Sequence, residues 1–204
     1  MRVSSSRCSR SLSRIAGIFL MFTALLSLPG CWVTSIEGLS EAGLLESDKD
    51  QTFDAGLIGT WSAKAENCAI TLAITAKDQT YQWEETGVGE DCNHDKPEFY
   101  YQADLFKLDN HEFLDVTARQ EDVCDICRGV HWIFLVQLGK DSFSLAPIDS
   151  DWLKNELEHK RVRIATLPDN KYTLTASAKD LKAFCRKYAD DKEAFKPDLT
   201  FKRK

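Results

Sequence analysis

The chain has 204 residues with 26 basic and 32 acidic side chains, so its formal net charge is −6. Residues 1–30 contain four arginines and no acid, which leaves 22 basic against 32 acidic side chains, a net charge of −10, in the rest. Because such a chain repels phosphate, nucleic acids and anionic lipids are excluded as partners held by charge alone. The length after residue 30 suits one domain with its own core.

The N-terminal segment has the pattern of an export signal. Four arginines precede an apolar run at residues 15–28, which is shorter than the roughly 20 residues of a membrane-spanning helix. The run ends in Leu28-Pro29-Gly30-Cys31, which resembles the lipobox of bacterial lipoprotein signals. The resemblance implies that residues 1–30 are a lipoprotein signal peptide and that Cys31 is the site of lipid attachment. The alternative is an ordinary secretory leader.

The residues after Cys31 predict which membrane holds the anchor and how the anchor is joined to the domain. In lipoproteins of double-membraned bacteria, Asp after the lipidated cysteine favours the inner membrane, so Trp32 implies the outer membrane. Several acyl chains make such an anchor effectively permanent. Residues 31–52 mix Ser, Gly and acids, and we interpret them as a lipid-anchored tether that docks in part on a domain over residues 53–204.

Ten runs of alternating apolar and polar residues predict short strands from residue 57 onward. They are 57–62, 68–75, 80–85, 99–108, 112–118, 130–138, 142–148, 161–167, 171–176 and 199–203. Helices are predicted over 150–159 and over 177–190, where Ser177 and Asp180 resemble a capping box. Hairpin-linked strands without βαβ alternation predict a mainly β protein, an antiparallel up-and-down barrel with two helices, one near the C-terminus.

The first strand carries Gly59-Thr60-Trp61, and a helix and a last strand close the domain. This resembles the calycin pattern of lipocalins and fatty-acid-binding proteins. The resemblance implies that Gly59 and Trp61 form the barrel motif and that Trp61 closes one end against a late arginine. Arg161, Arg163 and Arg203 are the candidates. The alternative places Trp61 in some other β core.

A longer pattern also bears on the family. FDAGLIGTW, HEFLDV, IDSDWL and LTASAKDLKAFCRKY together resemble a group of uncharacterised bacterial lipoproteins over most of residues 53–190. This resemblance implies the same architecture and supplies no function.

Four cysteines are predicted to meet at one rim of the barrel. Successive connections of an up-and-down barrel alternate between its ends, so residues 63–67, 86–98 and 119–129 share a rim. The cysteines there are Cys68, Cys92, Cys124 and Cys127. In an exported protein they favour two disulfides.

Three interpretations of this cysteine rim remain open. We favour disulfides from Cys68 and Cys92 to the Cys124/Cys127 pair, with Cys185 left as a buried thiol on its helix. The second interpretation is a zinc site built from the four thiolates, or from three of them with His94. The third is a redox pair at Cys124 and Cys127, which the surrounding acids disfavour.

Four residues of the predicted strands are candidates for lining a ligand pocket. His131 interrupts an apolar strand and is either a polar handle in a ligand pocket or a hydrogen-bonded core histidine. Tyr81, Trp83 and Tyr101 are close together on neighbouring strands, and they line a ligand cavity or fill the core. No nucleophile elbow, P-loop or dinucleotide motif is present, so no catalytic residue, metal or cofactor is expected.

These features predict a lipid-anchored protein of the cell envelope whose barrel binds an apolar small molecule, with the membrane as its partner through acyl chains. The alternative is a non-enzymatic interaction or structural protein of the envelope, with a packed barrel that contacts another protein. A zinc-binding enzyme at the cysteine rim is the third possibility.

Overall fold

The structure is a computed structural model. It describes residues 32–41, 48–65, 67–89, 92, 94–118, 129–197 and 199–204, with the backbone alone for 94–99. The predicted signal peptide, Cys31, Cys124 and Cys127 lie outside these residues. Within the part that is described, no helix has the length and apolar character needed to cross a membrane.

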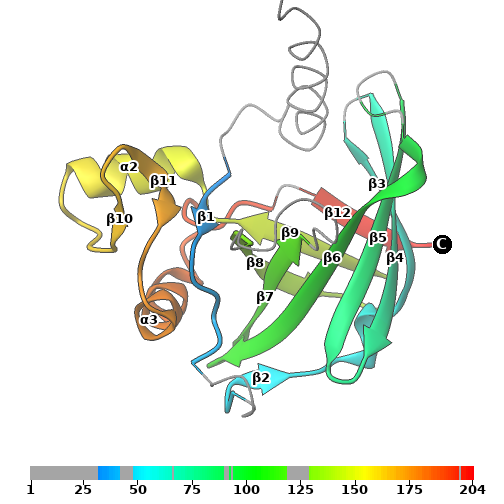
Figure 1. Ribbon diagram of the computed structural model, residues 1–204, viewed down its shortest axis with the longest axis horizontal. Coiled ribbons are helices and arrows are strands. Elements are labelled where there is room, and N and C mark those ends of the chain that lie inside the picture. Colours follow the sequence, from blue (N-terminus) through cyan, green and yellow to red (C-terminus); the bar gives the residue numbers. More distant parts are fainter. Residues whose placement is uncertain are drawn as a thin grey trace, which may run out of the picture. The chain divides into compact units, whose positions relative to one another are not determined.

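Eight antiparallel strands close into a barrel, which confirms the predicted fold class (Figure 1). The strands are β3 (Gly59–Ala65), β4 (Cys68–Lys77), β5 (Thr80–Gly89), β6 (His94–Leu108), β7 (His111–Ala118), β8 (His131–Leu138), β9 (Ser142–Pro147) and β12 (Leu199–Arg203). Strands β3 to β9 are neighbours in chain order, and β9 pairs with β8. Strand β12 pairs with both β9 and β3 and so removes the free edges of the sheet.

The two predicted helices are present, and each begins after a capping side chain. Helix α2 (Ser150–Glu158) starts after Asp149, whose carboxylate accepts a hydrogen bond from the backbone N–H of Trp152. Helix α3 (Ala178–Tyr188) starts after Ser177, whose hydroxyl accepts from the N–H of Asp180. Both caps satisfy backbone donors that a helix leaves free.

Two of the ten predicted strands lie outside the barrel. Strand β10 (Thr166–Leu167) is much shorter than the predicted run, and it pairs only with β11 (Asn170–Leu174). Strand β11 pairs with β1 (Thr34–Ser35), and β1 pairs in turn with β8. Because β12 already closes the barrel, these strands form an outer layer with the helices (Figure 1).

The two faces of the barrel strands pack into two separate hydrophobic cores. One face fills the barrel, and the other face of β6, β7 and β8 packs against the outer layer. The outer core joins Phe113, Ile133 and Leu135 of the barrel to Leu181 and Phe184 of α3. A strand such as β8 is therefore apolar on both faces because both are covered.

The segment predicted as a tether docks on the domain. Val33 and Leu39 are buried in the outer core, and the ring centroid of Trp32 lies 5.4 Å from that of Phe134. Strand β2 (Gln51–Thr52) then pairs with β6, and a short 3₁₀ helix, η1 (Ala55–Leu57), leads into β3. The chain is thus held against the barrel from the residue that follows Cys31.

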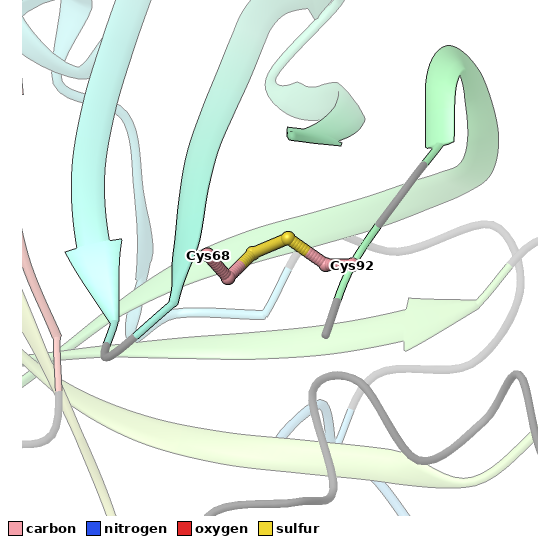
Figure 2. Close-up of a disulfide and its surroundings, with 2 residues drawn as sticks. All are labelled: Cys68 and Cys92. Carbon is pink, nitrogen blue, oxygen red and sulfur yellow. A yellow bond between two sulfur atoms is a disulfide. The ribbon is translucent and has the colours of Figure 1, made fainter. Parts of the chain in front are cut away.

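One disulfide joins Cys68 to Cys92, with their Cα atoms 5.6 Å apart (Figure 2). The prediction that each would bond to the Cys124/Cys127 pair is therefore wrong. Cys68 opens β4 opposite Gly89 at the end of β5, so the hairpin register brings Cys92, three residues farther on, to its side. Cys185 is a buried free thiol, as predicted.

Candidate functional site

One end of the barrel is closed by aromatic rings. Trp61 is 1% exposed, its indole N–H donates to the carbonyl of Leu57 at 2.8 Å, and its ring meets that of Phe143 edge-on. Phe143 in turn stacks on Phe201. These large rings fill the end of the barrel beneath η1, which we call the closed end.

Arg203 is the arginine that meets Trp61. Its guanidinium lies 4.2 Å from the centroid of the Trp61 ring and donates to the carbonyls of Gly56 and Ile58. Gly59 has a φ of 141°, and a Cβ there would lie 2.6 Å from an Arg203 nitrogen. The backbone angle therefore favours glycine at this position, and any larger residue would also have to displace the end of the Arg203 side chain.

Tyr81 belongs to the closed end and is buried there. Its hydroxyl accepts a hydrogen bond from the N–H of Asp54 and donates to the carbonyl of the same residue, and its ring stacks on Phe53. The structure thus separates Tyr81 from the other aromatic residues with which the sequence grouped it. Its polar atom is already satisfied by the chain.

The other predicted aromatic residues form a cluster nearer the opposite end. Trp83 on β5 and Tyr101 on β6 are register partners with ring centroids 5.6 Å apart. The ring centroid of Tyr101 lies 6.3 Å from that of Trp132 on β8. We call Trp83, Tyr101 and Trp132 the upper cluster. Trp83 is 6% exposed, and its indole Nε1 has no hydrogen-bond partner among the residues that the structure describes.

Glu85 shares the interior face of β5 with Trp83, two residues along the strand. It is 4% exposed, and burial raises the pKa of its carboxyl to about 7. Burial, and secondarily the charge of Glu85, also raise the pKa of Tyr101. The barrel thus contains a carboxyl group that changes charge near neutral pH. The sequence prediction missed Glu85, although alternation along β5 placed it on the face of Tyr81 and Trp83.

Substituting Glu85 is expected to change how stability depends on pH. Because the pKa of Glu85 is raised in the folded state, its protonated carboxyl contributes to the free energy of unfolding. That contribution is complete below about pH 4.5, the unfolded value, and is lost as pH rises through about 7. The Glu85→Gln variant should therefore gain up to about 3 kcal/mol over the parent at pH 8 and little at pH 4. Urea unfolding at both values measures this. Glu84→Gln, on the exposed face of β5, is the matched control, and equal pH dependence in all three proteins would contradict the prediction.

His131 does not line the barrel. It lies on the outer face of β8, where its Nδ1 is 2.6 Å from a carboxylate oxygen of Asp115. The other oxygen of Asp115 accepts from the N–H of Leu39, and Gly38 lies so close that a Cβ would overlap both side chains. Burial lowers the pKa of His131, but the hydrogen bond to Asp115 and the negative charges of Asp115, Glu37 and Asp104 together outweigh burial, so the net direction is upward. The pair of His131 and Asp115 thus holds the N-terminal segment at Leu39 against β7 and β8.

The zinc interpretation loses two ligands, because the sulfurs of Cys68 and Cys92 are bonded to each other. In the described parts of the chain, no group of three His, Cys, Asp or Glu residues is placed to hold a metal ion. The upper cluster with Glu85 is therefore the candidate site. No protein-family model matches this chain, and no curated protein or solved structure gives a significant match.

Proposed function

We propose that the protein is a lipid-anchored, non-enzymatic protein of the bacterial outer membrane whose barrel binds an apolar small molecule. The anchoring half of the proposal is supported by the basic and apolar leader that ends at Cys31 and by Trp32 after it. The binding half is supported by the upper cluster.

The unpartnered indole of Trp83 is the observation that carries the binding proposal. A buried N–H without an acceptor costs about 1–3 kcal/mol, so most such groups in proteins are satisfied. A ligand with an oxygen near Nε1 would recover this free energy. The rings of Tyr101 and Trp132 would supply apolar contact beside it.

The sizes of the interior side chains support placing the ligand at the disulfide end. The interior positions at the ends of β3, β5 and β7 carry small residues: Ala63, Ala65, Gly87 and Ala118. The closed end, by contrast, holds the large rings of Trp61, Phe143 and Phe201. Small side chains leave more of the barrel radius to a ligand.

We expect Trp83→Phe to weaken ligand binding, because it removes the N–H and keeps an aromatic ring. A fluorescent long-chain ester, cis-parinaric acid methyl ester, should bind the parent and bind the variant about fivefold to tenfold more weakly, the value of one hydrogen bond. Trp152→Phe on α2, outside the barrel, is the control. If the parent does not bind the probe and no lipophile co-purifies with it, the packed-barrel alternative is favoured instead.

The anchor has its own test. Cys31→Ser should abolish acylation and release the protein from the membrane fraction of the producing cells, because the thiol is the attachment atom. Mass spectrometry of the N-terminal peptide and fractionation measure both outcomes. A variant that stays in the membrane fraction would contradict lipid anchoring and leave the binding proposal standing.

A further inference from the structure

The N-terminal segment is packed and hydrogen-bonded against the domain. Val33 and Leu39 are buried in the outer core. Strand β1 pairs on one side with β8 and on the other with β11 (Figure 1), and the N–H of Ile36 donates to the carbonyl of Leu174 at 2.9 Å. A segment held at this many points does not act as the flexible tether that its composition predicts.

This docking limits how far the domain can stand from an acylated Cys31. A flexible chain over residues 31–52 would span about 25 Å, enough for the domain to move clear of a bilayer. Trp32, which packs on Phe134, is instead joined to Cys31 by one peptide bond, and one residue reaches at most about 3.6 Å. Acyl chains on Cys31 would therefore hold the surface around Trp32 at the lipid headgroups.

That surface is the face of β1 and β11 that points away from helix α3. Thr34 and Thr173 are register partners, with their hydroxyl oxygens 3.3 Å apart. The intervening residues Val33 and Leu174 point the other way, into the outer core with α3. Two residues before each threonine come Trp32 and Lys171, on the same face. We call the partly or fully exposed residues Trp32, Thr34, Lys171 and Thr173 the β1–β11 face.

The side chains of the β1–β11 face suit a bilayer interface. The ring of Trp32 meets that of Phe134 edge-on and is otherwise partly exposed, and tryptophan is enriched where membrane meets water. Lys171 can lay its apolar stem along such a surface and reach phosphate with its ammonium. Its nitrogen is 3.7 Å from Glu158, and an exposed pair of this kind is weak enough to be exchanged for a phosphate contact.

Building on the proposed lipid anchoring, we propose that the β1–β11 face is a membrane-contact surface. It rests on the phospholipid headgroups of the bilayer that holds the Cys31 acyl chains, with the Trp32 ring at headgroup level. The domain is then carried against the bilayer in one orientation, because the anchor enters a docked strand and not a free linker.

Bromine quenching of tryptophan fluorescence tests this contact. The acylated full chain is placed in phosphatidylcholine vesicles, and the emission of Trp32 is obtained as the difference between the parent and Trp32→Phe. Lipid brominated near the headgroup end of its acyl chain should lower that emission at least about twofold, because an interfacial ring contacts this part of the lipid. Lipid brominated at the far end of the chain should quench it less. Trp152→Phe on α2, which packs on the opposite face, is the control and should reveal no quenching.

Lysine acetylation gives a second measurement that needs no tryptophan variant. Lys171 should react more slowly with a water-soluble acetylating reagent in the vesicle-bound parent than in unacylated Cys31→Ser in solution, because the bilayer covers it. Lys179, on the exposed face of α3, should react at the same rate in both proteins.

The outcomes separate this inference from the anchoring on which it rests. An acylated parent in which Trp32 and Trp152 are quenched equally, or in which Lys171 and Lys179 react alike, would overturn the membrane-contact surface and leave the anchor intact. Absence of acyl chains on the Cys31 peptide by mass spectrometry would overturn the anchor and the inference together. Thermal unfolding of the two tryptophan variants shows that each is folded before its emission is compared.

Discussion

Replacing Lys182 by Met should destabilise the domain by about 3–5 kcal/mol, the usual cost of removing one partner of a buried ion pair. The Lys182 side chain is 0% exposed, and its ammonium lies 2.7 Å from Asp48 and 2.9 Å from Asp50. Burial lowers the pKa of Lys182, but the hydrogen bonds and the charges of the two carboxylates together outweigh burial, so the net direction is upward. Met fills the space and leaves the carboxylate of Asp48 buried without its cation.

The loss should be specific to the buried cation. Lys179→Met makes the same change on the exposed face of α3 and should alter the free energy of unfolding by less than about 0.5 kcal/mol. Adding Asp48→Asn to Lys182→Met should recover part of the loss, because it neutralises the stranded charge. Urea unfolding of the four proteins measures these differences, and similar stability of Lys182→Met and Lys179→Met would refute the prediction.

The pH dependence of this cluster follows from the same contacts. Burial raises the pKa of Asp48, but the hydrogen bond and charge of Lys182 together with two backbone N–H groups outweigh burial, so the net direction is downward. At Asp50 the hydrogen bonds and charges of Lys182 and Arg186 together outweigh the effect of burial on the pKa in the same direction. A pKa lowered in the folded state contributes stability that is present above the unfolded value of 3.8 and lost as pH falls. The parent should therefore lose this contribution below about pH 4, where Lys182→Met has less to lose.

Trp61→Ala should cost about 3–5 kcal/mol, the range for removing a large buried ring. The substitution deletes the contact with Phe143, the hydrogen bond to the Leu57 carbonyl and the surface on which Arg203 rests. It would leave a cavity at the closed end, which η1 covers. Thermal or urea unfolding measures the loss.

Variants of Arg203 distinguish the contribution of the Trp61 ring to stability from that of the arginine that lies on it. Arg203→Ala should cost about 1 kcal/mol, since an exposed cation–π contact is worth roughly 0.5–1 kcal/mol and its two carbonyl acceptors regain water. Adding Arg203→Ala to Trp61→Ala should cost less than it does alone, because the two residues share one contact. Lys202→Ala, on the outer face of β12, is the control. A Trp61→Ala loss below about 1 kcal/mol would contradict a closing role for the ring.

Local patterns predicted the elements well because they depend on neighbours in the chain. The end of β12 at Arg203 and the caps Asp149 and Ser177 follow from alternation and from side chains that reach their own backbone. The predicted strand over 161–167 fails at all but its last two residues, because only β11 is available for pairing there.

The face of a strand could not be assigned from its own residues. Strand β8 is apolar on both sides, so its pattern does not say which side enters the barrel, and His131 was placed among ligand-lining candidates although it lies outside with Asp115. The cysteine pairing was missed for a related reason. Strand order grouped four cysteines at one rim, but the β4–β5 register selects Cys92 for Cys68.

The net charge of −10 after the leader, the mainly β architecture and the position of the last helix could be read from the sequence, because composition and short-range periodicity are properties of the chain itself. The choice of Arg203 as the partner of Trp61, the burial of Lys182 between Asp48 and Asp50, and the meeting of Glu85 with the upper cluster were decided only by the tertiary structure. Each depends on groups far apart in the sequence, or on which face of a strand is enclosed, and barrel closure determines both.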